Sequence, residues 1–323
     1  MNFDYKKILS FWNLTFSATK EEVSFYGSPE RSDFRVAVIG KTDQIFVLEK
    51  INPNFVKHKE EIAQNIFLLQ KENPKLEIVA YLKNKNNSFV TLVENDFWLL
   101  SPFISGVPLN RKNYLDESWR GDAMADFILH FKNKADKLFT KPKNVFSLPE
   151  YVEKICADME KFNPKEREVL DPIIKHLQQN FFSIYPQLPT AFCHGDYHPV
   201  NILWGEKEIK GVIDWEFCGF KPEMYDVANM VGCLGMEHPN TLSKKIVLNF
   251  LQKFKQTQIF SPLHWQQFIN TIIALRFAWL SEWLRKKDTE MIELEIDYLF
   301  LLLDNKDNLE KIWGIKKSPL GSD

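Results

Sequence analysis

The chain has 323 residues, of which 45% are hydrophobic and 26% are charged, and its formal net charge is −2. This composition is ordinary for a globular protein that is large enough for more than one lobe. The near-neutral charge excludes a strong basic field for nucleic acid, and no apolar run has the length of a membrane span. The N-terminus shows no secretory leader, and the four cysteines suggest neither a metal cluster nor a disulfide framework. We therefore expect a cytoplasmic protein without a nucleic-acid or membrane partner; its oligomeric state is not indicated.

The first hundred residues have the pattern of strands with one helix. Residues 57–72 carry Ile62, Ile66 and Leu69 at helical spacing, with charged residues on the opposite side. Short runs rich in β-branched and aromatic residues predict strands, the first two of them joined as a hairpin: residues 36–40, 45–48, 78–82, 89–93 and 97–100. This part of the chain is expected to be an antiparallel sheet with one helix.

After the Pro- and Gly-containing stretch 101–108, the pattern becomes mostly helical. Long amphipathic segments predict helices: residues 120–138, 147–161, 165–184, 240–256 and 263–303. The strand-like segment 192–216 interrupts them, and residues 316–323 have the composition of a frayed tail. The fold class is therefore α+β, with an N-terminal sheet lobe at 1–104 and a larger helical lobe at 105–323.

The strand-like segment carries polar residues at the edges of apolar runs. Asp196 follows His194 by two residues, Asn201 follows Asp196 by five, and Asp214 follows Asn201 by thirteen. Pro199 disfavours a regular helix here, so Asp196 is expected on a loop. Phosphoryl transfer uses one carboxylate to orient a hydroxyl, and an Asn and a second carboxylate to hold magnesium. The spacing therefore predicts such a site, with His194 more suited to bracing the loop than to chemistry.

The motif from His194 to Asn201, followed by Ile213-Asp214-Trp215-Glu216, resembles the aminoglycoside phosphotransferase and choline kinase family. Gly219 and the run Tyr225-Asp226-Val227-Ala228-Asn229 also match the pattern of that family. These are small-molecule kinases with a two-lobed, protein-kinase-like fold. The resemblance covers the chain in layout, but its specific motifs lie within residues 194–229.

The resemblance implies a role for each matching residue. Asp196 would be the catalytic base, and Asn201 and Asp214 would be the magnesium ligands. Glu216 matches a second acid that contacts a metal directly or through water, although it could also be a plain carboxylate at a helix start. Asp226 would brace the catalytic loop, because a helix N-terminus favours a carboxylate.

The nucleotide-binding residues are less clearly marked. Ser28 lies in a turn-rich loop that has one glycine and could still reach phosphate. In the family a Lys or Arg often follows the apolar triplet of a strand, but here Glu49 takes that place and Lys50 follows. Strand alternation puts these two side chains on opposite faces. Either Lys50 serves from an unusual place, or a bulge shifts the register, or another residue fills the role.

Two further features bear on the ligands. Glu60 and Glu61 are both candidates for the acid that pairs with the strand cation, and Ser101 and Phe103 lie where backbone groups would bond adenine. Near the C-terminus, Arg276 lies in an apolar stretch and needs a partner or a ligand. Its aromatic neighbours could form a box for a quaternary amine, or simply belong to the core: Phe277, Trp279 and Trp283.

Together these features predict an ATP- and Mg²⁺-dependent kinase that phosphorylates a hydroxyl of a small polar metabolite. Amino sugars, hexosamines, choline, ethanolamine, homoserine and aminoglycosides are the acceptors to consider. A catalytically silent nucleotide-binding module is an alternative, because the strand lysine is missing. A protein-kinase-like enzyme is another, although the short interval from Asp214 to Asp226 leaves little room for an activation segment. A metal-dependent hydrolase would need a tighter cluster of ligands than His194, Asp196, His198 and Asp214 provide.

Overall fold

A computed structural model describes residues 3–23, 25, 32–41 and 43–315, and the statements below concern these residues. The chain forms two compact units: unit 1 comprises Met1–Pro108 and Ile202–Glu216, and unit 2 comprises Leu109–Asn201 and Phe217–Asp323. The expected lobes divide the chain once, at 104/105. The structure differs in assigning residues 202–216, which carry Asp214 and Glu216, to unit 1.

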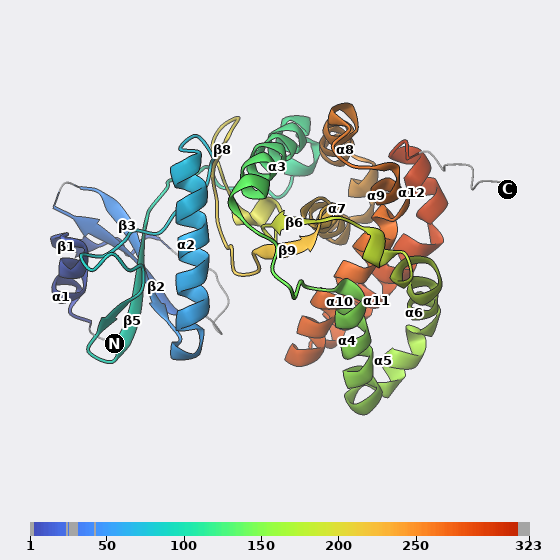
Figure 1. Ribbon diagram of the computed structural model, residues 1–323, viewed down its shortest axis with the longest axis horizontal. Helices are drawn as coiled ribbons and strands as arrows, with labels where there is room; N and C mark the ends of the chain where they lie inside the picture. The colour runs from blue at the N-terminus through green and yellow to red at the C-terminus, as the bar shows by residue number, and fades with distance from the viewer. Residues whose placement is uncertain (1–2, 24, 26–31, 42, 316–323) are drawn as a thin grey trace. The chain divides into compact units, whose positions relative to one another are not determined.

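Unit 1 is built on a five-stranded antiparallel sheet with the order β1-β2-β3-β5-β4 (Figure 1). A separate two-stranded hairpin, β7 and β8, also belongs to it. The elements are α1 (Tyr5–Leu9), β1 (Phe16–Thr19), β2 (Ser32–Gly40), β3 (Ile45–Ile51), α2 (Val56–Glu72), β4 (Thr91–Val93), β5 (Asp96–Pro102), β7 (Ile202–Trp204) and β8 (Ile209–Val212). The predicted 36–48 hairpin and the helix at 57–72 are confirmed as β2–β3 and α2.

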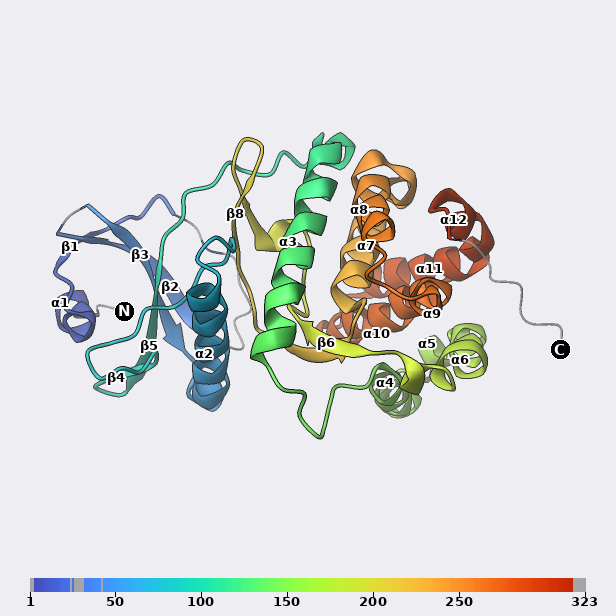
Figure 2. The ribbon, with the colours of Figure 1, turned by 45° about the horizontal axis from the view of Figure 1, so that its top comes forward.

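The two faces of this sheet bury different sets of residues. On one face, Leu48 and Trp98 pack with Ile8 and Leu9 of α1. On the other face, Leu99 of β5 packs with Ala63 of α2. Figure 2 shows the long helix α2 beside the sheet. Successive residues of β3 alternate between these faces, so Glu49 faces the α2 side, opposite Leu99, and Lys50 faces the α1 side, opposite Trp98.

The prediction of a strand at 78–82 is wrong. Ile78 forms only an isolated parallel bridge with Val212, whose backbone N–H donates to Glu77 O at 2.8 Å. The segment therefore meets part of its backbone hydrogen-bonding need with β8 rather than by adding a strand to the sheet. Ile78 and Ala80 are still buried, and Val79, Tyr81 and Leu82 are partly buried, which accounts for the β-like composition.

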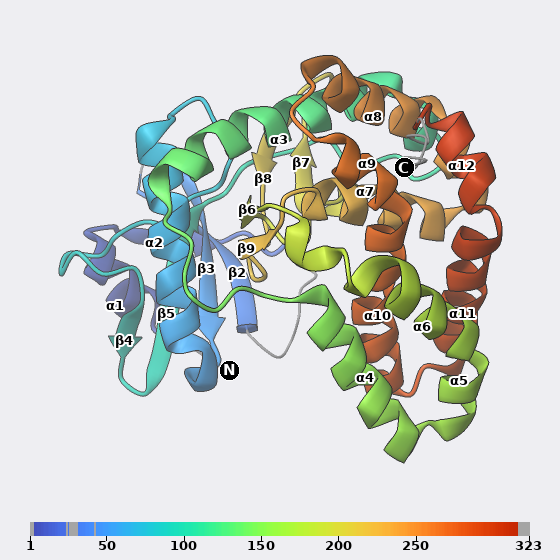
Figure 3. The same ribbon diagram turned by 45° about the vertical axis from the view of Figure 1, so that its right-hand side comes forward.

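Unit 2 is mostly helical, and Figure 3 shows α10 and α11 side by side within it. Its strands β6 and β9 pair antiparallel, so that Cys193 lies opposite Gly219. The elements are α3 (Ser118–Leu138), α4 (Leu148–Phe162), α5 (Pro164–Val169), α6 (Asp171–Leu177), β6 (Thr190–Cys193), β9 (Gly219–Pro222), α7 (Tyr225–Glu237), α8 (Lys245–Thr257), α9 (Pro262–Gln266), α10 (Phe268–Lys286), α11 (Thr289–Asp304) and α12 (Lys306–Ile312).

Two of the long predicted helices are broken. Within the run 263–303, α10 ends at Lys286 and is followed by Lys287, which has a left-handed φ of 56°. Helix α11 begins at Thr289, after Asp288, whose carboxylate accepts a hydrogen bond from Met291 N. Apolar spacing continues through such a break, so periodicity alone does not locate it. The run 165–184, which the structure describes throughout, is also divided, but without a left-handed residue or a side-chain cap: α5 ends at Val169, and Asp171-Pro172 opens α6. In the part of the chain described here, we find no helix with the length and apolarity that a membrane span requires. The expected tail at 316–323 lies outside the described residues.

Candidate active site

The loop that carries Asp196 begins directly after β6 in unit 2. Asp226, in the first turn of α7, accepts hydrogen bonds from the backbone N–H groups of His194, at 2.7 Å, and Gly195, at 2.8 Å. Burial raises the pKa of Asp226 to about 6, although these two hydrogen bonds act to lower it. The carboxylate therefore ties the start of the loop to α7, as the bracing role requires.

Gly195 is needed at this point for two physical reasons. Its φ of 87° lies in the left-handed region that other L-residues avoid. A Cβ at this position would also lie 2.1 Å from the carbonyl oxygen of Phe217. The loop can therefore turn here, next to the chain that enters β9, only with glycine.

Asp196 is held by the side chains around it. Asn201 Nδ2 donates to the backbone oxygen of Asp196 at 2.9 Å and to its Oδ2 at 3.0 Å, and His198 Nε2 lies 3.5 Å from Oδ1. Burial acts to raise the pKa of Asp196, but the hydrogen bonds and charges of His198, His194 and Asn201 outweigh it and lower the pKa. Asp196 is therefore an ionised acceptor near neutral pH, which is the state that orienting a hydroxyl requires.

His194 is fully buried beneath this loop. Its Nδ1 accepts the backbone N–H of Asp196 at 3.1 Å, and its ring packs edge-on against Tyr197 at 5.9 Å. This environment fits the predicted bracing role, because the ring contacts the loop backbone.

Unit 1 contains the other two acids of the motif. Asp214 follows β8 and has a φ of 63°, a conformation that costs energy in a non-glycine residue and that Asp tolerates better than most. Trp215 Nε1 donates back to Val212 O at 3.0 Å, which closes the turn. Glu216 is 7% exposed, and its backbone oxygen pairs with His58 Nε2 at 3.0 Å. The turn thus presents a strained aspartate next to a buried glutamate.

The carboxylate of Glu216 accepts a hydrogen bond from Lys59, which is not among the predicted site residues. Lys59 of α2 donates from Nζ to Glu216 and, at 2.6 Å, to Oε1 of Glu49. Burial acts to lower the pKa of Lys59, but the interactions with Tyr81 and with the carboxylates of Glu49 and Glu216 outweigh it and raise the pKa. The signal was present in the sequence: Lys59 precedes Ile62 and Ile66 by three and seven residues and so lies on the apolar face of its helix.

Lys50 lies on the other face of the sheet. Its Nζ is 2.9 Å from Asp96 Oδ1 and 5.5 Å from the centre of the Phe3 ring. The structure brings Lys50 together with these residues and not with Lys59 or Glu216, so it does not support Lys50 as the cation for the nucleotide.

The proposed acid partners of that cation are also engaged elsewhere. Glu60 accepts hydrogen bonds from the backbone N–H of Phe89, at 3.1 Å, and of Val90, at 2.6 Å, so it fixes the loop before β4. Glu61 is 62% exposed and lies 4.0 Å from Lys57. Neither carboxylate is paired with Lys50 in the described contacts.

The remaining nucleotide-binding candidates are placed as follows. Ser28 lies outside the described residues. Ser101 is in β5 opposite Val47, and the backbone N–H of Phe103 donates to Ile45 O at 3.0 Å. These two residues therefore mark the end of the strand at which the family resemblance places adenine.

Arg276 has a protein partner. Its Nε and Nη2 lie 2.6 and 2.5 Å from the two carboxylate oxygens of Glu295 on α11, and both side chains are almost fully buried. Phe277 belongs to the core, but Trp279 and Trp283 are only half-buried and stack at 6.1 Å. Trp279 also lies 6.3 Å, ring to ring, from His198. The structure thus separates the predicted box: Phe277 lies in the core, Trp279 lies near His198 of the Asp196 loop, and Trp283 stacks on Trp279 and donates from Nε1 to Glu295.

The oxygen donors of Asn201, Asp214 and Glu216 suit Mg²⁺, which needs few protein ligands, better than a metal whose ligands all come from the protein. Nδ2 of Asn201 in unit 2 is engaged by Asp196, so Oδ1 is the atom that could bind a cation, and in unit 1 the turn after β8 carries the carboxylates of Asp214 and Glu216. Within the described ranges, no three His, Cys, Asp or Glu side chains gather as a metal cluster. Mg²⁺ is usually held by one or two protein carboxylates with water and substrate phosphates, so this donor set suits it.

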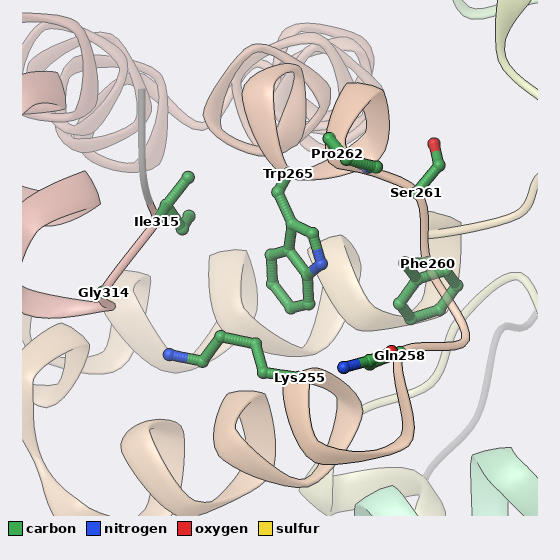
Figure 4. Close-up of a pocket in the computed structure, with 8 residues that line it drawn as sticks. All are labelled: Lys255, Gln258, Phe260, Ser261, Pro262, Trp265, Gly314 and Ile315. Atoms are coloured by element: carbon green, nitrogen blue, oxygen red, sulfur yellow. The ribbon is translucent and has the colours of Figure 1, made fainter. Parts of the chain in front are cut away.

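A pocket of about 410 Å³ lies elsewhere in unit 2 (Figure 4). Trp265 and Lys255 form part of its wall, and Lys255 Nζ donates to Trp313 O. The lining residues are Lys255, Gln258, Phe260, Ser261, Pro262, Trp265, Gly314 and Ile315, none of which is a predicted site residue.

Asp226→Asn should change how stability depends on pH. The pKa of Asp226 is about 6 in the folded protein and 3.8 ordinarily, so the folded state binds the proton more tightly. That contribution to stability is complete below the ordinary pKa and is lost as pH rises through about 6. The unfolding free energy of wild type minus that of the variant should therefore fall by up to about 3 kcal/mol between about pH 4 and pH 7. Urea unfolding across this range measures the difference; a pH-independent difference contradicts the assignment.

Known proteins resemble the chain in sequence pattern and in fold. The family model described as the phosphotransferase enzyme family matches residues 32–258. No curated protein sequence matches significantly.

Three solved structures illustrate the similarity of fold. The amicoumacin kinase hAmiN, in complex with AMP-PNP, Ca²⁺ and Ami, has a TM-score of 0.68 at 11% identity, over 92% of this chain and 93% of its own. An aminoglycoside phosphotransferase from Alicyclobacillus acidocaldarius has a TM-score of 0.62 at 11% identity, over 96% and 98%. Aminoglycoside 2'-phosphotransferase-IIIa in its GDP complex has a TM-score of 0.61 at 15% identity, over 93% and 97%. The predicted two-lobed kinase fold is confirmed by these similarities.

Proposed function

Since this chain belongs to the phosphotransferase enzyme family and is a small-molecule kinase with an alcohol group as acceptor, we propose that it uses ATP and Mg²⁺ to phosphorylate a polar metabolite. The observation that carries the proposal is the state of Asp196: a carboxylate that is 18% exposed, is held by Asn201 and His198, and has a lowered pKa.

Asp196 is the catalytic residue of this proposal. Its carboxylate accepts a hydrogen bond from the acceptor hydroxyl and aims the oxygen at the γ-phosphorus of the nucleotide. The new O–P bond forms as the bond from the γ-phosphorus to the β,γ-bridging oxygen breaks, and the hydroxyl proton passes to Asp196 and then to solvent. His194 and Asp226 hold the loop backbone, which fixes the direction of the carboxylate.

Asn201, Asp214 and Glu216 are the residues proposed to hold the metal. When bound, Mg²⁺ neutralises charge on the phosphates and so favours transfer. Backbone groups at Ser101 and Phe103 are proposed to bind adenine, and Ser28 to contact phosphate.

The acceptor belongs to the class of small polar metabolites: an amino sugar or hexosamine, choline or ethanolamine, homoserine, or an aminoglycoside. The similar solved structures include complexes of other kinases with amicoumacin-type and aminoglycoside-type antibiotics. In this chain, the half-buried Trp279 next to His198, with Trp283 stacked on it, is proposed to offer an apolar surface to whichever acceptor reaches Asp196.

One observation favours a second candidate, a nucleotide-binding module without turnover. Glu49 stands where the family often has a strand cation, and Lys50 faces away from it. A protein that binds nucleotide without that cation could have lost catalysis.

A turnover assay tests the proposal directly. ADP release from ATP with Mg²⁺ should depend on one of a panel of acceptors comprising glucosamine, N-acetylhexosamines, choline, ethanolamine, homoserine and an aminoglycoside, and should stop with EDTA. Acceptor-independent ADP release is the control. Nucleotide binding with no turnover on any acceptor would support the silent module instead.

A further inference from the structure

The ion pair between strand β3 and helix α2 has an inverted polarity in this chain. The resemblance places a cation on the strand and an acid on the helix. Here the strand supplies Glu49 and the helix supplies Lys59, whose Nζ lies 2.6 Å from Glu49 Oε1. The Lys59 side chain has no exposed surface, and that of Glu49 is 7% exposed. Because of this inversion, the cation of the pair comes from α2, and Lys50 of β3 pairs with Asp96 instead.

Lys59 has a second carboxylate partner, and this partner lies in the metal-binding motif. Its Nζ donates to Oε1 of Glu216, two residues after Asp214. The preceding residue of α2, His58, pairs through Nε2 with the backbone oxygen of Glu216 at 3.0 Å. Consecutive residues of α2 therefore hold the side chain and the backbone of Glu216.

The surrounding charges fix Lys59 in this position. Arg35 of β2 lies opposite Glu49 in the sheet, with its Nε 3.6 Å from Glu49 Oε2. Arg35, Glu49, Lys59 and Glu216 thus alternate in sign, and their formal charges cancel. Removing Lys59 would take from the buried carboxylates of Glu49 and Glu216 a cation that both of them bond, which is far more costly than removing an exposed ion pair.

Full burial between two carboxylates suits Lys59 to hold a neighbour rather than to contact a nucleotide. We propose that Lys59 is a positioning residue that holds Glu216, and with it the turn that carries Asp214, in the arrangement that binds Mg²⁺ with the nucleotide. This inference rests on the proposed function. The residues that match the family motif lie within 194–229, so the resemblance does not predict this positioning role for a residue of α2.

The test uses the full chain and five variants, the fifth of which combines Glu216→Gln with Lys59→Met. Lys59→Met removes the cation, and E49Q/K59M removes it together with the charge of one of its two buried carboxylate partners. Glu216→Gln removes the proposed metal-facing charge. Lys57→Met is the matched control, because Lys57 lies on the same helix with a side chain that is 92% exposed.

The readout is the rise in thermal unfolding midpoint on adding AMP-PNP, titrated with MgCl₂. The Mg²⁺ concentration that gives half of this rise should increase about 10- to 100-fold in both Lys59 variants, as for residues that orient a metal ligand. Lys59→Met should also unfold on the order of 10 °C lower without ligand, and E49Q/K59M should recover part of that loss. Lys57→Met should match wild type in both measurements.

Glu216→Gln should raise the half-rise Mg²⁺ concentration by a similar factor. Combining it with Lys59→Met should raise that concentration little further, because both substitutions act through the Glu216 carboxylate. If E49Q/K59M folds and its half-rise Mg²⁺ concentration stays near that of wild type, Lys59 only stabilises the fold and the inference is overturned. If wild type itself shows no rise with AMP-PNP at any Mg²⁺ concentration, the proposed function fails, and the inference fails with it. The two failures are thus distinguished by the wild-type titration.

Discussion

Replacing Asp196 by asparagine is expected to lower kcat by about 10²- to 10⁴-fold while the protein stays folded. Asparagine has nearly the same shape, so the contacts of the loop with Asn201 and His198 can be largely kept. It carries no negative charge and cannot take the proton of the acceptor hydroxyl. The measurement is steady-state turnover with ATP, Mg²⁺ and the acceptor that the panel identifies.

The control for this prediction is Asp126→Asn on α3. Asp126 is 46% exposed and pairs at 3.0 Å with Lys253, a surface ion pair of small energetic value. Its variant should retain wild-type kcat. Turnover by Asp196→Asn within a few fold of wild type would show that another group orients the hydroxyl.

Replacing Arg276 by methionine is expected to lower the free energy of unfolding by about 3–5 kcal/mol, because Glu295 would be left buried without its cation. Two hydrogen bonds of 2.6 and 2.5 Å join the guanidinium to this carboxylate, whose side chain has no exposed surface. The pair links α10 to α11, so its loss should loosen the packing of these two helices. Urea unfolding monitored by tryptophan fluorescence and by circular dichroism measures the change.

Two further variants give this prediction its contrast. Arg285→Met on the same helix removes a guanidinium that is 54% exposed and pairs with Glu282, so it should cost no more than about 1 kcal/mol. R276M/E295L removes both charges and should recover most of the lost stability. A loss that is equal in R276M and R276M/E295L would mean that packing, and not the buried charge, sets the effect.

The sequence was sufficient for the elements whose apolar pattern has a single period. Helix α2 could be found this way because it buries one face, and the β2–β3 hairpin because two short β-rich runs flank a polar turn. The segment 78–82 has the composition of a strand yet forms only one bridge, since composition reports burial and not the partner of the backbone. The long C-terminal helical pattern likewise did not show its break, which depends on a left-handed Lys287 and the cap at Asp288.

The candidate site divides in the same way. The loop around Asp196 could be recognised from sequence because its residues are close along the chain, and the spacing itself carries the chemistry. Lys59 could not be assigned, because its partners Glu49 and Glu216 are 10 and 157 residues away and only folding brings them together. The family pattern predicts that an acid on this helix, here Glu60 or Glu61, pairs with a cation on the strand. In the structure the helix supplies the cation, Lys59, and the strand supplies the acid, Glu49.

The close approach of Gly195 to Phe217 also determines what random mutagenesis can recover. A Cβ at position 195 would meet the carbonyl oxygen and carbon of Phe217 at 2.1 and 2.7 Å, and every amino acid at 217 carries the same two atoms. The Phe217 side chain is 50% exposed, so many replacements should be accepted there. A saturation library should therefore keep glycine at 195 beside a variable position 217, and no second-site suppressor of a 195 defect should arise from the side chain at 217.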